Sequence, residues 1–212
     1  MSWDFKRELA RKVIHLLSIF ILLIYFGVSL KFGENVALIA LTFILILFIE
    51  VEYLRLEWVK NLPLLKRIWN YVLREKEKDK IGGDIFFLIG AILVLAVFDT
   101  KIAVTAILMT IFGDLSAALF GSRFGHNYLT RFPEKAWEGI FAELIVNIIV
   151  GFVVLISLFE MSLFVALPVL FIMSVTATFV ETIVTRIDDN LLIPLFSGFN
   201  GQVIFFLIML LH

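Results

Sequence analysis

Carboxylates near the ends of apolar stretches are the residues of this sequence with the clearest potential for chemistry. Glu181, Thr185 and Asp188 are spaced i, i+4 and i+7, so a helix would present them on one face, and Asp189 follows directly. Carboxylates this close repel one another unless a cation joins them, and Mg2+ takes a few carboxylates together with waters and phosphate oxygens. A solvated turn in which Arg186 neutralises one aspartate is the alternative. The predicted metal ligands are Asp114, Glu181, Asp188 and Asp189.

Asp114 lies inside another apolar stretch, next to a row of small residues. Gly113, Ala117, Gly121 and Gly125 recur every four residues, which permits the close approach of a neighbouring helix or a ligand. Helix packing alone would explain the glycines, but a buried carboxylate beside them must be protonated or bind a cation. We therefore predict a catalytic role for Asp114. Gly113 and Gly121 in this row are predicted to contact the nucleotide, and so is Asn190, directly after Asp189.

A lysine stands just before the start of an apolar stretch, in the run Lys135, Ala136, Trp137, Glu138 and Gly139. Helix N-termini present free N–H groups and a positive dipole end, which suit a phosphate group. Lys135 would add a point charge there. The run therefore predicts Lys135 and Glu138 as catalytic residues, and Lys135 and Gly139 as nucleotide contacts. Interfacial anchoring by the lysine, with Glu138 offsetting the helix dipole, is the alternative.

Basic residues also begin the first apolar stretch. Arg11 and His15 share a helix face at i and i+4, and Lys12 lies beside it. Arg11 and Lys12 are predicted to contact nucleotide phosphate, and His15 is a candidate catalytic residue that competes with Asp114 for the role of general base. A basic flank whose side chains extend to the membrane surface, with a structural histidine, is the alternative.

One polar pair is expected to have a structural role. Glu143 and Asn147 are spaced i and i+4 within an apolar stretch, where such side chains commonly hydrogen-bond to a neighbouring helix. We therefore do not include them among the predicted site residues.

The elements that must position these residues are long and apolar. Of the 212 residues, 61% are hydrophobic and 17% are charged, against roughly half and roughly a quarter in soluble domains. A helix that crosses the membrane needs about 20 apolar residues. Such runs occupy residues 13–30, 36–52, 83–99, 101–120, 138–158, 162–185 and 191–211. We predict an all-α integral membrane protein, in which a bundle of about seven transmembrane helices forms one catalytic domain over residues 1–212.

The basic residues predict the orientation of this bundle. If the N-terminus is cytoplasmic, all but two of the 18 Lys and Arg residues, Lys31 and Lys101, fall on the cytoplasmic side. The positive-inside rule then indicates an N-in, C-out topology with the site facing the cytoplasm. Between the second and third apolar runs, about residues 53–80 predict an amphipathic helix on the membrane surface, with basic residues opposite leucines and tryptophan.

Taken together, these motifs resemble the CTP-dependent polyprenol kinase family, which includes dolichol kinase. It is related to phytol kinases, CTP-dependent diacylglycerol kinases and, distantly, phosphatidate cytidylyltransferase. The residues that carry the resemblance are Arg11-Lys12-x-x-His15, Gly113-Asp114-x-x-Ala117 with Gly121 and Gly125, Lys135-x-x-Glu138-Gly139, and Glu181 followed by Asp188-Asp189-Asn190, Ile193-Pro194 and Ser197-Gly198. Similar proteins usually carry Ser or Thr where this sequence has Ala136.

The resemblance implies transfer of the γ-phosphate of CTP to the hydroxyl of a polyprenol or dolichol, with Mg2+ as cofactor. The implied partners are CTP, a membrane lipid alcohol and the bilayer; no nucleic acid is expected, and a homo-oligomer stays open. Kinases of diacylglycerol, geranylgeraniol or phytol and a cytidylyltransferase-like activity are alternatives within the same resemblance. A small cation-coupled transporter is the alternative of another class, but it would place its charges near the membrane midplane and show an internal repeat.

Overall fold

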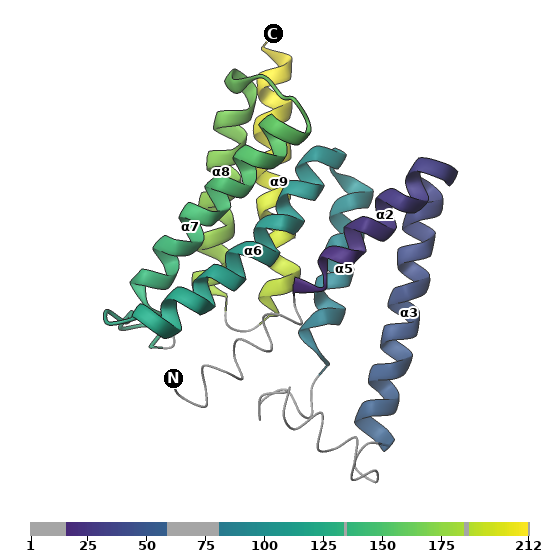
Figure 1. The fold of residues 1–212 in the computed structure, drawn as a ribbon, viewed down its shortest axis with the longest axis horizontal. Coiled ribbons are helices and arrows are strands. Elements are labelled where there is room, and N and C mark those ends of the chain that lie inside the picture. Colours follow the sequence, from purple (N-terminus) through teal and green to yellow (C-terminus); the bar gives the residue numbers. More distant parts are fainter. Residues whose placement is uncertain (1–15, 59–80, 134, 185–186, 212) are drawn as a thin grey trace. The chain divides into compact units, whose positions relative to one another are not determined.

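The computed structural model describes residues 16–58, 81–133, 135–184 and 187–211, and these are almost entirely helical. The chain divides into two compact units, Met1–Ile89 and Gly90–His212, which are described separately below. Helix α5 (Gly83–Val97) crosses the boundary between them. Figure 1 shows the helices in sequence colours.

The first unit contains a helical hairpin of α2 (Ile19–Phe32) and α3 (Glu34–Trp58), which pack on each other. Gly33 joins them with a φ of 88°, a left-handed conformation that glycine adopts without steric cost. Its N–H donates to the carbonyl of Ser29 at 2.9 Å and so ends α2. The buried hydrophobic residues of this hairpin are Leu22, Tyr25, Ala37 and Leu41.

The end of α3 differs from the sequence prediction. Residues 53–58 continue α3, although we expected them to begin the interfacial segment, and residues 59–80 lie outside the described part of the chain. Arg55 donates two hydrogen bonds of 2.7 Å to Glu52, one helical turn earlier, and this ion pair stabilises the added turns. The Glu52 carboxylate also accepts the N–H of Gly82 at 2.6 Å, just before α5 begins.

The second unit contains four long helices that succeed one another up and down. They are α6 (Thr100–Phe124), α7 (Trp137–Gly151) with its π-helical continuation η3 (Phe152–Leu158), α8 (Leu163–Ile183) and α9 (Asp189–Leu210). Helix α6 packs against α7, α8 and α9, and 61% of its apolar window is buried, the largest share among these helices. It is therefore the central helix of the unit (Figure 1).

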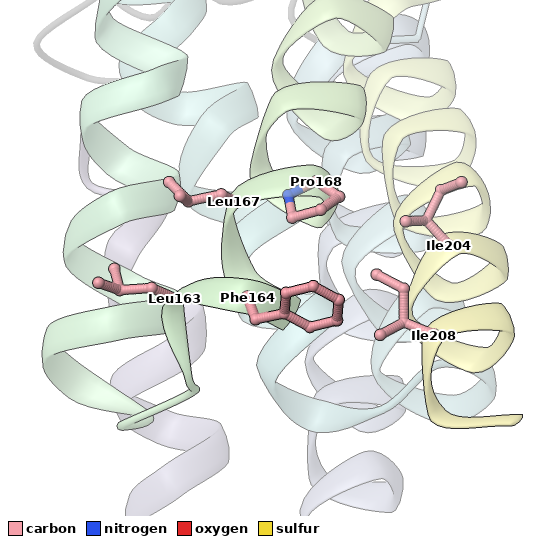
Figure 2. Close-up of a pocket in the computed structure, with 6 residues that line it drawn as sticks. All are labelled: Leu163, Phe164, Leu167, Pro168, Ile204 and Ile208. Atoms are coloured by element: carbon pink, nitrogen blue, oxygen red, sulfur yellow. The ribbon is translucent and has the colours of Figure 1, made fainter. Parts of the chain in front are cut away.

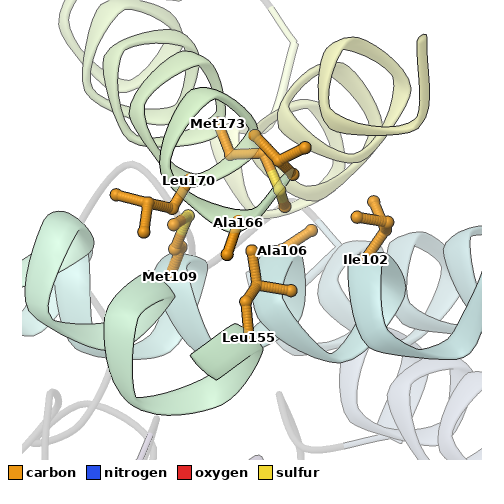
Figure 3. Packing of buried hydrophobic residues seen from close by; sticks show 8 residues of the cluster. Ile102, Ala106, Met109, Leu155, Ala166, Leu170 and Met173 are labelled. Atoms are coloured by element: carbon orange, nitrogen blue, oxygen red, sulfur yellow. The ribbon is translucent and has the colours of Figure 1, made fainter. Parts of the chain in front are cut away.

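An apolar core holds three of these helices together. Side chains from α6, η3 and α8 interdigitate in it, as Figure 3 shows for most of its members. The buried members are Ile102, Ala106, Met109, Leu155, Ala166, Val169, Leu170 and Met173. At about 25 cal/mol per Å2, burial of such side chains is the main term that stabilises the packing.

Length and composition favour a membrane location for these helices. Five of them are long and apolar enough to cross a membrane, namely α3, α6, α7 with η3, α8 and α9, and α2 and α5 are shorter apolar helices. Each of the seven predicted apolar runs thus overlaps a helix. The all-helical fold of a membrane protein is confirmed at this level. Seven membrane crossings, their orientation and the interfacial helix stay predictions.

Candidate functional site

Charged residues from four consecutive elements meet at one end of the second unit. Because the helices alternate in direction, the C-terminal ends of α6 and α8 and the N-terminal ends of α7 and α9 lie at the same end. Asp114 comes from α6, Glu143 from α7, Glu181 from α8 and Asp189 from α9. Glu181 interacts electrostatically with the other three carboxylates, and Glu143, Glu181 and Asp189 also act on Lys135. We call these four carboxylates the acidic cluster.

Lys135 pairs directly with the acidic cluster. Its Nζ donates a hydrogen bond to Oε1 of Glu181, and the two side chains form an ion pair. The Glu181 side chain is 6% exposed and the Lys135 side chain 31%, so the pair lies at the edge of the buried region. Burial alone would lower the pKa of Lys135, but the attraction of Glu181, its hydrogen bond, and the charges of Asp189 and Glu143 raise it above its ordinary value. Lys135 therefore stays charged at neutral pH.

The loop between α6 and α7 fixes the backbone of Lys135. Tyr128 and Ala136 form an antiparallel β-bridge. The carbonyl of Lys135 accepts the N–H of Leu129 at 3.0 Å, and its own N–H donates to Phe132 at 2.9 Å. Both backbone groups are thus hydrogen-bonded, so the side chain leaves the loop from a defined position.

Glu138 closes the same loop. Its carboxylate accepts the backbone N–H groups of His126 and Asn127 at 3.2 Å each, and the Asn127 side-chain amide at 3.3 Å. The sequence predicted a catalytic role for Glu138, whereas the structure shows a carboxylate that ties the loop to the first turn of α7. This contact gives Glu138 a structural function, and a catalytic one stays a prediction.

The glycines predicted to contact nucleotide lie where α6 and α7 approach each other. A Cβ at Gly139 would sit 2.8 Å from the carbonyl oxygen of Ala117 and 3.2 Å from Cα of Gly121. A Cβ at Gly113 would sit 2.6 Å from Oδ1 of Asn147. Gly113 and Gly121 on α6 therefore pack against α7, and Gly139 on α7 packs against α6. Nucleotide contact by these glycines stays a prediction.

Asp188 and Asn190 form the start of α9. Asp188 is the N-cap residue, and its Oδ1 accepts the N–H of Asn190 at 3.1 Å. Asp189 follows as the first helical residue and belongs to the acidic cluster. Of the two aspartates predicted as metal ligands, Asp188 thus caps α9, and Asp189 belongs to the acidic cluster.

Asp114 lies deeper than the sequence indicated. Helix α6 continues to Phe124, ten residues beyond Asp114, which corresponds to roughly 15 Å at 1.5 Å per residue. Among the described residues, no three His, Asp or Glu side chains converge closely enough to form a metal site by themselves. Arg11, Lys12 and His15, the other predicted site residues, lie outside the described residues.

Two residues that we did not predict for the site, Glu143 and Asn147, lie next to it. Both are buried on α7, and Asn147 donates to Oγ1 of Thr178 on α8 at 3.2 Å, as expected for a cross-helix hydrogen bond. Glu143 in addition interacts electrostatically with Lys135, Asp114 and Asp189. Its place within an apolar run was the signal in the sequence, since carboxylates are costly there.

An apolar hollow lies at the other end of α8 and α9. It has a volume of about 410 Å3, and its lining comes from the first turns of α8 and the last turns of α9 (Figure 2). The lining residues are Leu163, Phe164, Leu167, Pro168, Ile204 and Ile208. Because these side chains offer no hydrogen-bonding group, the hollow is not a candidate for phosphate chemistry.

Comparison with known proteins bears on this arrangement. The chain is 31% identical over 124 residues to CTP-dependent diacylglycerol kinase 1 of Schizosaccharomyces pombe. The aligned stretch covers 58% of this chain and 56% of that protein. The chain is 26% identical over 144 residues to CTP-dependent diacylglycerol kinase 1 of Saccharomyces cerevisiae, covering 68% of this chain and 49% of that protein. The chain is thus similar to CTP-dependent lipid kinases over somewhat more than half of its length.

This similarity to CTP-dependent lipid kinases agrees with the resemblance found in the sequence motifs. The chain spans about half the length of the curated relatives it matches. No family profile matches the chain, and no solved structure matches it. Support for the CTP-dependent lipid kinase family therefore comes from sequence similarity to these relatives.

Proposed function

We propose that this chain transfers the γ-phosphate of CTP to the hydroxyl of a membrane lipid. The observation that carries the proposal is the position of Lys135 beside the acidic cluster at one end of apolar helices. Phosphoryl transfer needs mainly positioning and neutralisation of charge, which a lysine and metal-binding carboxylates supply. Similarity to CTP-dependent diacylglycerol kinases supports the choice of donor and of a lipid acceptor.

Mg2+ suits the residues of the acidic cluster. Oε2 of Glu181 is buried and has no hydrogen-bond partner among the described residues, and a cation beside it would stabilise the ionised carboxylate. Mg2+ usually takes one or two carboxylates and completes its shell with water and phosphate, so three converging acids are not required. Asp114, Glu181 and Asp189 would hold it, with Asp188 as a further predicted ligand. The bound ion would neutralise charge on the phosphates of CTP.

Lys135 can contact a phosphate and keep its hydrogen bond to Glu181. A lysine ammonium has three N–H donors, and the structure uses one of them for Glu181. Because 31% of the Lys135 side chain is exposed, the remaining donors can reach a ligand from the aqueous side. In this proposal Glu181 orients Lys135, and Lys135 contacts the transferred phosphate. Asp114 and His15 stay the candidate general bases.

The acceptor is a lipid alcohol in this proposal. The sequence motifs resemble those of polyprenol and dolichol kinases, whereas the names of the relatives above point to diacylglycerol. Both acceptors present a hydroxyl on a long apolar body, which matches a charged site at the end of apolar helices. The site would face the cytoplasm because the basic residues favour that side.

The test is a phosphorylation assay with the purified full chain. Labelled CTP and Mg2+ would be supplied with a polyprenol or with diacylglycerol, and ATP would replace CTP in a parallel reaction. We expect one labelled lipid product that requires CTP and Mg2+, and the better acceptor identifies the substrate class. Absence of product with every acceptor, together with no binding of CTP, would contradict the proposal.

A further inference from the structure

A polar pair lies deeper in the helices than Lys135, and the proposal above assigns neither of its residues to Mg2+ or to CTP. Glu143 and Asn147 are spaced one helical turn apart on α7, and they are 2% and 0% exposed. Asn147 uses its amide N–H to donate to Thr178 on α8, and its Oδ1 faces Gly113 on α6. The pair thus lies at the contact of three helices, and Glu143 interacts electrostatically with Asp114.

The oxygens of this pair lack donors. Among the described residues, Oε2 of Glu143 and Oδ1 of Asn147 are buried without a hydrogen-bond partner. A buried acceptor left unpaired costs free energy, so nearly all such atoms in folded proteins are satisfied. The amide oxygen of Asn147 accepts hydrogen bonds, and so does a carboxylate oxygen of Glu143, so a donor group would satisfy both atoms.

The position along α7 indicates which donor fits. Lys135 precedes α7 and is partly exposed, whereas Glu143 lies six residues after Trp137, roughly 9 Å along the helix axis. A nucleotide that meets Lys135 comes from the exposed side. The group that receives its phosphate must approach from the opposite, deeper side, where Glu143 lies. A lipid hydroxyl is a donor that reaches this depth with its apolar body in the bilayer.

We propose that Glu143, with Asn147 beside it, accepts a hydrogen bond from the hydroxyl of the lipid acceptor and so orients it toward the phosphate. This inference rests on the proposed function and names two residues of the acceptor site.

The test compares a lipid alcohol with its O-methyl ether, which cannot donate a hydrogen bond. Competition for the purified full chain would be measured with dioleoylglycerol and with a polyprenol, each beside its methyl ether. We expect the wild-type chain to prefer the alcohol by about tenfold, the size of a hydrogen bond to a carboxyl group. Glu143→Leu should remove the preference, and Glu143→Gln should reduce it. Leu is tolerated at a buried carboxylate because an apolar side chain avoids the desolvation cost.

Two measurements keep the outcomes distinct. A cooperative thermal unfolding transition in detergent, followed by circular dichroism, should show that Glu143→Leu is folded. Glu160→Gln, a change of an exposed glutamate in the connection between η3 and α8, should keep the full preference for the alcohol. If wild type phosphorylates a lipid but Glu143→Leu keeps the tenfold preference, this inference fails and the kinase assignment stands. If wild type neither binds CTP nor phosphorylates any lipid, the proposed function fails first.

Discussion

Lys135, in the loop before α7, donates a hydrogen bond to Glu181, which lies two residues before the end of α8. The pair joins positions 46 residues apart and links the loop to the acidic cluster. Its neighbours Asp189 and Glu143 strengthen the attraction that holds the ammonium in place. The stability of the loop and the placement of the charge that meets phosphate therefore depend on the same contact.

Removal of the lysine should destabilise the chain. Lys135→Met leaves the buried Glu181 carboxylate without its partner, and we expect the free energy of unfolding to fall by about 3 kcal/mol. Glu181→Gln should cost less, because Lys135 is partly exposed and can turn to water. The double variant should recover most of the loss, as measured by unfolding in detergent. Strictly additive effects of the two changes would show that the pair contributes no coupling energy.

The pair also predicts a dependence on alkaline pH. The folded pKa of Lys135 lies above its ordinary value of 10.5. Its stabilising contribution is therefore complete below pH 10.5 and is lost as the pH rises through the higher folded pKa. The difference in melting temperature between wild type and Lys135→Met should stay constant from about pH 7 to 10 and shrink above that range. A difference that shrinks already between about pH 7 and 9 would argue against a raised pKa.

The close contact of α6 and α7 predicts an effect of one methyl group. In Gly139→Ala the new Cβ would approach the Ala117 carbonyl oxygen to 2.8 Å. Since the atom that this Cβ meets belongs to the backbone of a packed helix and cannot turn away, the helices must move apart, at a cost of about 1 to 3 kcal/mol in unfolding free energy. The matched control is Gly27→Ala in α2, where a Cβ meets nothing within 4 Å. It should be neutral or stabilise slightly, and equal losses in both variants would refute the packing argument.

Glu138 should control the mobility of the loop that carries Lys135. Glu138→Ala removes the acceptor of the His126 and Asn127 N–H groups, so these amides should exchange with deuterium faster than in wild type. Hydrogen exchange measured by mass spectrometry over residues 124–133 tests this. Exchange in α8 serves as the internal reference and should not change. Unaltered exchange at His126 and Asn127 would mean that the carboxylate does not hold the loop.

Asp114 should be needed for metal-dependent activity. Asp114→Asn keeps the shape of the side chain but removes its charge, and we expect kcat/KM for lipid phosphorylation to fall by about 100-fold or more. The Mg2+ concentration for half-maximal activity should rise. Asp99→Asn is the matched control, because Asp99 caps the other end of α6 by accepting the N–H of Lys101, and asparagine caps equally well. Wild-type activity in Asp114→Asn would exclude its catalytic role.

The sequence predicted the elements better than their contacts. Apolar length located the seven helices because burial of apolar side chains acts over whole runs and needs no knowledge of partners. It did not locate the end of α3, where the pair of Glu52 and Arg55 adds helical turns after the apolar run. Nor could it predict the pairing of Lys135 with Glu181, since that contact depends on the β-bridge at Ala136 and on the alternation of four helices.

The candidate site shows the same division. The positions of Asp114, Glu181 and Asp189 near helix ends were readable from the sequence, and the structure brings their charges within range of one another. The sequence predicts for Glu143 only a structural hydrogen bond to a neighbouring helix, because its spacing from Asn147 identifies a helix face but not what that face meets. Gly113 and Gly139 could serve packing or binding, and only the position of α7 against α6 shows the packing contact.

Gly113 and Asn147 also bear on how such sequences can diverge. The amide oxygen of Asn147 occupies the space that any side chain at position 113 would need, 2.6 Å from the place of a Cβ. A larger residue at 113 therefore becomes acceptable only after position 147 has become smaller, and the opposite order passes through a clash. We expect the two positions to be inherited as a pair, with the same history in every descendant that retains Asp114.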